Sequence, residues 1–319
     1  MSVFRRFDDQ YLDLCQRILK DGERVVNYRP SDTRDGAASS NIPDHSAQGQ
    51  RGSATIRLPH QGLQFDLSEE FPILTTKFVG WKTAILEALW IYQVQSNDVR
   101  WLQERGIHIW DEWEISEDGH YMGKTWDPKE FAHTIGTAYG WVVRRYHLTQ
   151  SLIETLKTNP GNRRMIMSLW QNEWLPTASL PSCVWNTQWH VSNLDGPHPR
   201  LNLMVTVRSN DVPLGLPFNV TQYAALCCLI AHCVGMEPGQ MTYVINDAHI
   251  YENQVDGIKE QIRRHQEKIS TDGELYPAPT LWINPEVTDF FAFDNSKELK
   301  DIKLENYQHQ GRLKMPVTE

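Results

Sequence analysis

Apolar side chains recur along the chain with two different spacings, and each spacing predicts one type of element. Near the N-terminus, Leu12, Ile18 and Leu19 share one side of a predicted helix. The helical spacing predicts helices over residues 5–21, 80–95, 217–235 and 252–268. The third of these is strongly apolar and is closed by Gly235 and Pro238, whereas the fourth is charged.

Alternating apolar and polar positions predict strands in the second half of the chain. In the clearest case, Leu201, Leu203 and Val205 alternate with residues that point to the other side. Strand-like runs lie at 163–170, 182–191, 201–209 and 241–251, and a short strand is expected before FPILTTK at 71–77. Because helices flank these strands, the pattern predicts an α+β fold in which helices surround a mixed β-sheet. We expect residues 1–319 to form one domain.

Two polar segments interrupt this pattern. Residues 29–53 are rich in Gly, Ser, Asp and Pro, and residues 115–135 form a second polar stretch. Neither shows a sustained apolar period, so both are predicted to be loop insertions.

Composition excludes several classes of protein. A net charge of −9 argues against broad nucleic-acid binding, so any anionic ligand needs a local group of arginines. The N-terminus lacks the apolar core of a signal peptide, and no run looks long enough to cross a membrane. The cysteines are odd in number and form no CxxC pair, which excludes a disulfide framework and a zinc site. We therefore expect a reduced, cytoplasmic protein without a metal.

Glu87 is the first residue that does not fit a purely structural interpretation. It lies inside TAILEALWIY, with Ile85, Leu86, Leu89 and Trp90 around it. Burying a polar group without a partner costs roughly 2–7 kcal/mol. One interpretation is structural: the carboxylate reaches solvent, or a nearby arginine satisfies it. The other is that it handles protons with a pKa raised by its apolar surroundings.

Arginines at the ends of predicted strands form a second candidate group. Arg163 and Arg164 precede one strand, Arg208 and Ser209 end another, and Arg29 opens the polar loop. Each is readily explained as a surface residue. Together, in an acidic protein, they could instead form a cage for a phosphate group.

Three polar residues near predicted element ends carry two interpretations each. Asn219, at the start of the apolar helix, could be an N-cap or could hydrogen-bond both a donor and an acceptor on a heterocycle. His249 and Tyr251 lie on one side of a predicted strand. They could pair structurally or bind the hydroxyl of a sugar.

Cys183, in the segment LPSCVWNTQWHV, is either a core thiol or a nucleophile. As a thiolate it would be favoured by nearby arginines rather than by a histidine, because no histidine directly follows it. That absence weakens the hypothesis of a cysteine hydrolase. The residues alone therefore point to an anion-binding enzyme.

Eight segments then occur together, in the order and at spacings compatible with one enzyme family. They are FPILTTK, EALW, IWDEW, AYG, NRRMIMSLW, LPSC, RSNDVPLGLPFN and DAHIY. In these segments, which run almost end to end, the chain resembles thymidylate synthase, especially the variant found in some Gram-positive bacteria and their phages. One short motif is weak evidence, but eight in sequence are highly specific. The resemblance implies a thymidylate synthase-like sheet at a homodimer interface.

The resemblance also implies a reaction and a set of residues. The reaction is reductive methylation of dUMP to dTMP with 5,10-methylenetetrahydrofolate as co-substrate, and Cys183 attacks C6 of the pyrimidine. The implied catalytic residues are Cys183, Glu87, Tyr139, Asp211 and Asn219. The nucleotide would contact Arg29, Arg163, Arg164, Gln188, Arg208, Ser209, Asn219, His249 and Tyr251, with Arg163 and Arg164 supplied by the partner subunit. The folate would lie against Ile109, Trp110, Trp113, Asp211, Gly215 and Phe218.

Some positions depart from the family pattern. Asn246 stands where glycine is usual, and the chain ends in Thr318 and Glu319 instead of small apolar residues. The long polar loop leaves Arg34 and Arg51 as alternatives to Arg29. The tail bears on water exclusion, so a dUMP 5-hydroxymethylase, which adds water instead of hydride, is the alternative function.

Overall fold

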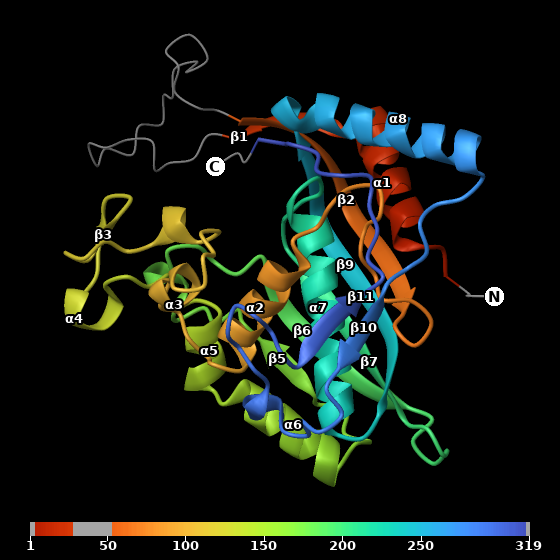
Figure 1. The fold of residues 1–319 in the computed structure, drawn as a ribbon. Coiled ribbons are helices and arrows are strands. Elements are labelled where there is room, and N and C mark those ends of the chain that lie inside the picture. Colours follow the sequence, from red (N-terminus) through yellow and green to blue (C-terminus); the bar gives the residue numbers. More distant parts are fainter. Residues whose placement is uncertain (1–3, 28–52, 317–319) are drawn as a thin grey trace.

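The computed structural model describes residues 4–27 and 53–316, in which helices pack on one large mixed β-sheet (Figure 1). The strand order is β1-β2-β9-β7-β6-β5, and β8 pairs with β9. The strands are β1 (Glu23–Asn27), β2 (Ser53–Asp66), β5 (Ile166–Ser168), β6 (Val184–Ser192), β7 (Arg200–Val207), β8 (Asn210–Asp211) and β9 (Glu237–Tyr251). Because β9 is parallel to β7 and antiparallel to β2, the sheet is mixed, and the predicted α+β class is confirmed.

The four helices predicted from apolar spacing are present. The helices are α1 (Phe7–Asp21), α2 (Trp81–Tyr92), α3 (Arg100–Gln103), α4 (Pro128–Phe131), α5 (Gly140–Arg145), α6 (Leu148–Thr158), α7 (Gly215–Cys233) and α8 (Val255–Asp272). Two short hairpins lie apart from the large sheet, β3 (His120–Tyr121) with β4 (Lys124–Thr125) and β10 (Thr280–Ile283) with β11 (Ile302–Glu305). The predicted helix over 252–268 begins later than expected, because Glu252–Gln254 forms a 3-10 turn.

The apolar helix α7 is the centre of the core. Leu226, Leu229 and Ile230 are fully buried, since α7 packs against β7 and β9 and also against α2. By length and composition α7 is apolar enough to cross a membrane, so the expectation that no run is long enough was wrong. In the fold, 83% of this apolar stretch is buried, as in the core helix of a globular protein.

Strand β2 is much longer than the short strand expected before FPILTTK. It spans 14 residues and pairs with β9 from Thr55 opposite Tyr251 to Asp66 opposite Gln240. Pro59, and His60 with a φ of 54°, interrupt its local pattern. The strand persists through these residues because β9 supplies hydrogen-bonding partners on both sides of the interruption.

The two faces of the sheet differ as the alternation predicts. Leu201, Leu203 and Val205 point into the core and are buried. On the outer face, a row of paired residues crosses three strands from Ile166 through Gln188 to Met204. Ile166 is 50% exposed and Met204 is 40% exposed, so in a single chain this face presents apolar groups to solvent.

The polar stretch 115–135 is a folded insertion, which corrects its prediction as a loop. It contains the β3–β4 hairpin and the one-turn helix α4, which extend away from α1 and α8 (Figure 1). Ile115 is fully buried, and Trp126 donates from Nε1 to the carbonyl of Thr177 at 2.8 Å. A few buried side chains, such as Ile115 and Trp126, therefore hold the insertion against the rest of the fold. The other polar segment, 29–53, lies almost wholly outside the described residues.

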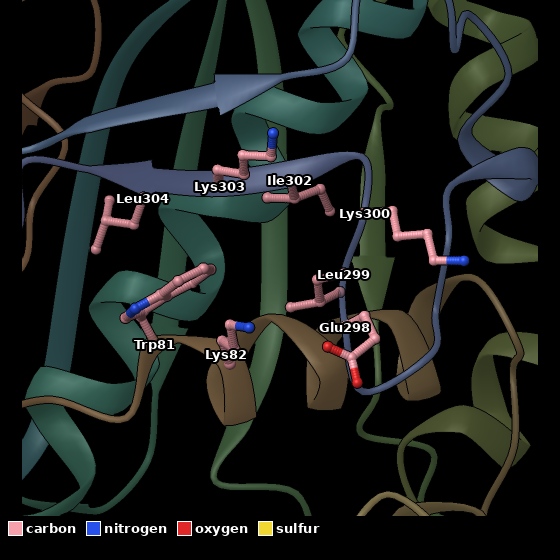
Figure 2. A pocket seen from close by; sticks show the side chains of 8 residues that line it. All are labelled: Trp81, Lys82, Glu298, Leu299, Lys300, Ile302, Lys303 and Leu304. Carbon is pink, nitrogen blue, oxygen red and sulfur yellow. The ribbon is translucent and has the colours of Figure 1, made fainter.

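The C-terminal hairpin packs beside the start of α2. Figure 2 shows Trp81 and Lys82 of α2 facing Ile302, Lys303 and Leu304 of β11 around a surface pocket of about 540 Å³. Lys303 also lies over the ring of Trp282, with Nζ 4.6 Å from the ring centroid. This packing fixes the first turn of α2, the helix that carries Glu87.

Asp8 in the first turn of α1 binds the TTK segment at residues 75–77. Its carboxylate is 1% exposed and accepts hydrogen bonds from the backbone N–H groups of Thr75 and Thr76 at 3.0–3.1 Å. Both threonine hydroxyls donate to it as well, at 2.8 Å. One buried carboxylate thus ties α1 to the segment that leads into α2.

We predict that Asp8→Ala lowers the free energy of unfolding by about 3 kcal/mol, because it leaves several buried donors without an acceptor. Urea unfolding measures the change. Asp13→Ala is the control: Asp13 pairs with Arg17 on the surface, with its side chain 45% exposed, and its removal costs less than about 1 kcal/mol. Equal losses in the two variants would contradict the assignment of Asp8 as a buried tie.

Candidate active site

One cavity collects most of the residues that the sequence singles out. It has a volume of about 900 Å³ and is bordered by α2, α7, the ends of β7 and β9, and the β3–β4 hairpin. The predicted residues that line it are Glu87, Ile109, Trp110, Trp113, Tyr139, Cys183, Arg208, Ser209, Asp211, Gly215, Phe218, Asn219, His249 and Tyr251. Residues far apart in the sequence therefore surround one space large enough for a drug-sized ligand.

Cys183 lies directly before β6 and lines the cavity, partly exposed. Its carbonyl accepts from the backbone N–H of Arg208 at 3.0 Å, and β6 bulges immediately after it. The other cysteines are buried, and burial raises the pKa of Cys15 and Cys228 to about 12. Burial keeps those two thiols protonated and out of reach, whereas the thiol of Cys183 is accessible from the cavity.

Arg208 is fixed next to this thiol by the loop that carries it. Its Nε donates to the carbonyl of Ser182 at 3.1 Å, and its Nη2 donates to the carbonyl of Pro181 at 2.7 Å. The same Nη2 lies 3.7 Å from Cys183 Sγ. A cation so close to the sulfur stabilises negative charge on it, and the anchored guanidinium cannot turn away.

Tyr139 holds the other side of Cys183. Its hydroxyl oxygen accepts the backbone N–H of Cys183 at 2.9 Å, and its backbone has a φ of 45°, which few residues other than glycine adopt. The next residue, Gly140, has no room for a Cβ, which would lie 2.0 Å from the carbonyl oxygen of Ser96. The AYG segment therefore places a tyrosine ring in the cavity at the expense of backbone strain.

Glu87 is buried on α2 at 6% exposure, and its hydrogen-bond partners are not arginines. Trp110 donates to Oε1 at 2.5 Å and Gln222 donates to Oε2 at 2.6 Å. Burial raises the pKa of Glu87 to about 7, although both hydrogen bonds act to lower it. A carboxyl group that changes protonation near neutral pH at a cavity wall is suited to proton transfer.

Asn219 is not an N-cap, which corrects one of its two interpretations. Helix α7 begins at Gly215, with Leu214 as the preceding residue, so Asn219 lies in its second turn. Its Oδ1 accepts from Asn210 Nδ2 at 3.3 Å, and its Nδ2 donates to Gln222 Oε1 at 3.4 Å. Asn219 therefore does not cap the helix. Its amide side chain lines the cavity instead.

The end of β9 brings His249 and Tyr251 into the same cavity, and their rings meet edge to face at 5.2 Å. Beside them, Asp211 accepts from Gln254 Nε2 at 3.0 Å and from the backbone N–H of Leu214 at 2.9 Å. Burial raises the pKa of Asp211 above its usual value. Throughout the described part of the chain, no three His, Cys, Asp or Glu side chains are arranged to hold a metal ion.

Aromatic side chains line another part of the cavity. Trp110 meets Trp113 at 5.5 Å and Tyr139 at 5.3 Å between ring centroids, in edge-to-face geometry. The 3-10 turn Asp111–Trp113 sets the two tryptophans, and Ile109 next to them is 39% exposed. This aromatic wall offers apolar faces to a flat ring system.

Three of the predicted residues lie elsewhere in the described chain. Arg163 and Arg164 are exposed between α6 and β5, and Gln188 points from the outer face of the sheet. Arg208 is the arginine that lines the cavity among residues 4–27 and 53–316. Arg29, and its alternatives Arg34 and Arg51, fall outside the described residues, as do Thr318 and Glu319.

Several cavity residues were missed by sequence reasoning. The β3–β4 region contributes Tyr121, Met122, Lys124 and Trp126, although the segment was predicted to be a polar loop. Gln222 was not singled out in the sequence, yet its side chain donates to Glu87. A sequence signal was present, because Gln222 follows Asn219 by one helical turn in an otherwise apolar segment.

Comparisons with known proteins agree with this geometry. The family model described as thymidylate synthase matches residues 9–319. Thymidylate synthase from Clostridium beijerinckii is 44% identical over 98% of this chain and 98% of its own length, and that of Bacillus phage phi3T is 38% identical over 98% and 99%. The solved thermostable thymidylate synthase A from Bacillus subtilis superposes with a TM-score of 0.78 at 36% identity, covering 98% of this chain and 99% of that one.

The raised pKa of Glu87 predicts a pH-dependent difference in stability. Its pKa rises from 4.5 in the unfolded chain to about 7, so its contribution is fully present below pH 4.5 and is lost as the pH rises through 7. Relative to Glu87→Gln, the wild type should therefore lose stability between pH 5 and pH 8, by on the order of 3 kcal/mol at about 1.4 kcal/mol per pKa unit. Thermal unfolding at both pH values measures this.

The control for that comparison is Glu117→Gln, a change at an exposed glutamate of the insertion. Its stability difference from the wild type should be the same at both pH values. If Glu87→Gln also shows no dependence on pH, the carboxylate of Glu87 is not desolvated in the way its burial indicates.

Proposed function

The chain belongs to the thymidylate synthase family, and we propose that the cavity is the active site in which Cys183 attacks dUMP. The reaction of the family is reductive methylation of dUMP to dTMP with 5,10-methylenetetrahydrofolate as co-substrate. The observation that carries the assignment is the thiol of Cys183 next to an anchored Arg208, in one cavity with Glu87 and Asn219. The cavity thus contains the groups that the reaction needs: a nucleophile, a cation, a group that can transfer protons and an amide that can hydrogen-bond a base.

The nucleotide is proposed to lie along the β9 side of the cavity. Arg208 and Ser209 bind the 5′-phosphate, and among the described residues Arg208 Nη1 makes no hydrogen bond that would compete. His249 and Tyr251 bind the 3′-hydroxyl at the end of β9. Asn219 faces the edge of the uracil ring with one donor and one acceptor, which complement O4 and N3–H.

The chemical step begins when Cys183 Sγ forms a bond to C6 of the pyrimidine. The electron pair of the C5=C6 bond moves towards C5 and O4, where Asn219 donates a hydrogen bond to the developing negative charge. Glu87 exchanges protons with O4 through water. C5 then bonds to the one-carbon unit and loses its proton, and the bond between that carbon and the folate nitrogen breaks. Hydride from the folate adds to the same carbon as Sγ leaves C6, which restores the C5=C6 double bond and completes the methyl group.

Tyr139 assists this sequence as a neutral hydroxyl. Burial raises the pKa of Tyr139 well above its usual value, so a phenolate is disfavoured. Its oxygen already accepts the N–H of Cys183. We propose that its O–H hydrogen-bonds the water that takes the C5 proton, while it also holds the backbone that carries the nucleophile.

The remaining volume fits the folate. When bound, the folate supplies the one-carbon unit and the hydride that reduces it. Trp110 and Trp113 present the aromatic wall against which a pterin can stack, and Phe218 and Gly215 face them from the start of α7. Asp211, with its raised pKa, lies where it can hydrogen-bond polar atoms of such a ring.

The family is homodimeric, and we propose that the outer face of the sheet is the interface. A hollow of about 620 Å³ on that face is lined by Trp185 and Asn246, and by Arg208, which also lines the main cavity. The phosphate side of the site therefore adjoins the outer face. Since a dianion needs more than one arginine, Arg163 of the partner subunit and Arg164 of the partner subunit are proposed to complete it, with Gln188 on the same face.

We also propose a cytoplasmic location, because the mechanism requires Cys183 in its reduced form. Among the described residues, no two cysteines are joined in a disulfide. Residues 1–319 are proposed to act as one domain, since the cavity draws on both halves of the chain.

We predict that Cys183→Ser loses at least about a thousandfold in turnover, because the hydroxyl is a far weaker nucleophile. Its affinity for dUMP stays within about threefold, since the phosphate and base contacts remain. Calorimetry and a product assay measure the two effects.

In the wild type, dUMP and methylenetetrahydrofolate should yield dTMP and dihydrofolate, and 5-fluoro-dUMP with the folate should form a covalent adduct. Formation of 5-hydroxymethyl-dUMP and tetrahydrofolate would overturn the proposed methylation.

The shared site predicts complementation between two inactive variants. Cys183→Ser and the double variant Arg163→Ala/Arg164→Ala should each have little activity alone. After unfolding and refolding as an equal mixture, about a quarter of wild-type activity should return, because half the dimers contain one complete site. A mixture that stays inactive, while dimers form, would show that these arginines act within their own subunit or not at all.

A further inference from the structure

A line of hydrogen-bonded side chains connects the buried carboxylate to the amide that faces the base. Gln222 Nε2 donates to Glu87 Oε2 at 2.6 Å, and Gln222 Oε1 accepts from Asn219 Nδ2 at 3.4 Å. Asn219 Oδ1 in turn accepts from Asn210 Nδ2 at 3.3 Å. Gln222 is 2% exposed and lines the cavity, so it occupies the middle of a buried network that adjoins the substrate.

The direction of this network is set at its Glu87 end. Trp110 Nε1 can only donate, and Glu87 in its ionised form can only accept, so in that form both of its oxygens receive hydrogen bonds. Gln222 therefore presents its NH2 group to Glu87 and its oxygen to Asn219. At the other end, Asn210 Oδ1 is buried and has no hydrogen-bond partner among the described residues, so nothing there imposes a direction.

The consequence is a fixed polarity for Asn219. Its NH2 group is turned towards Gln222 and its oxygen towards Asn210. With the amide reversed, Asn219 Oδ1 would face Gln222 Oε1, and Asn219 Nδ2 would face Asn210 Nδ2. Asn210 can turn its amide to relieve the second contact, but Glu87 holds Gln222 in place. The contact between the two oxygens therefore stays repulsive, and in a buried site it is poorly screened.

Uracil and cytosine present opposite hydrogen-bonding groups to an amide. Uracil has an acceptor at O4 and a donor at N3, whereas cytosine has a donor at the C4 amino group and an acceptor at N3. An amide held in one orientation therefore binds one base well and leaves mismatched polar groups with the other.

We propose that Gln222 is a positioning residue that orients Asn219 for uracil, and thereby helps the enzyme select dUMP over dCMP. This inference rests on the proposed function, since it assumes that Asn219 faces the base of the nucleotide. Gln222 acts through Asn219 and Glu87 and need not touch the base.

Two substitutions separate the two hydrogen bonds that Gln222 makes. Gln222→Met has a similar length and removes both. Gln222→Glu keeps an oxygen that accepts from Asn219, and its protonated form can still donate to Glu87. A second carboxyl group next to Glu87 nevertheless competes for its proton.

Calorimetric dissociation constants for dUMP and dCMP, with kcat for dUMP, test the proposal. In Gln222→Met, dUMP should bind about tenfold more weakly and the preference for dUMP over dCMP should narrow about tenfold. In Gln222→Glu, the preference should stay within about threefold of the wild type, while kcat falls by about tenfold or more. This split between binding preference and turnover would not arise from a merely structural residue.

Gln261→Met is the matched control. Gln261 is also a fully buried glutamine, but it hydrogen-bonds Tyr11 and Thr76, away from the cavity. Its substitution should lower thermal stability and leave the preference between the two nucleotides unchanged.

The proposal is overturned if folded Gln222→Met keeps the wild-type preference within about twofold. It is also overturned if Gln222→Glu loses the preference, and this second criterion holds even if Gln222→Met does not fold. Wild-type protein that converts dUMP, together with an unchanged preference in the variants, would refute the role of Gln222 alone. Wild-type protein that neither binds nor converts dUMP would instead refute the proposed function.

Discussion

The burial of Glu87 is the constraint on which the site depends. A carboxylate on the inner side of α2 needs donors, and in this fold they come from Trp110 in the following loop and from Gln222 on α7. To provide them, α7 must pack directly against α2, and the loop carrying Trp110 must fold back over both. The residual desolvation appears as a pKa of about 7, which makes this structural tie useful in proton transfer.

The nucleophile is organised by backbone contacts more than by side chains. The backbone N–H of Cys183 donates to Tyr139, and its carbonyl accepts from the N–H of Arg208. The position of the sulfur therefore follows from the pairing of the start of β6 with the end of β7. Arg208 is held by the carbonyls of Pro181 and Ser182, which keeps its charge near the sulfur before any substrate arrives. If Cys183 is the nucleophile, as we propose, such preorganisation would replace an adjacent histidine, because a fixed cation stabilises a thiolate.

The sheet serves both the core and the proposed assembly. Its inner face buries the apolar side of β7 against α7, whereas its outer face exposes Ile166 and Met204. Arg208 lies at the boundary, since it lines both the main cavity and the hollow on the outer face. Pairing of two chains through this face would cover the exposed apolar groups and would bring additional cations to the site that each chain leaves incomplete.

The order of apolar and polar residues in the sequence was enough to predict most helices and strands of the core. The spacing of apolar residues was enough for α1 and α8, and alternation was enough for β6, β7 and β9, because these elements bury one face. Helices α2 and α7 were found because long apolar segments are buried on nearly all sides. Motif order was enough for the family and for most residues of the cavity. Glu87 was identified because a charge among apolar neighbours is costly wherever the chain folds.

Tertiary structure alone decided the remaining features. The length of β2 depends on its pairing with β9, and the folding of residues 115–135 depends on a few distant anchors such as Trp126 with Thr177. The partners of Glu87 could not be read from the sequence, since Trp110 and Gln222 are 23 and 135 residues away from it. Hydrogen bonds are short and directional, so the sequence determines which groups need partners, whereas only the packed fold determines which groups meet.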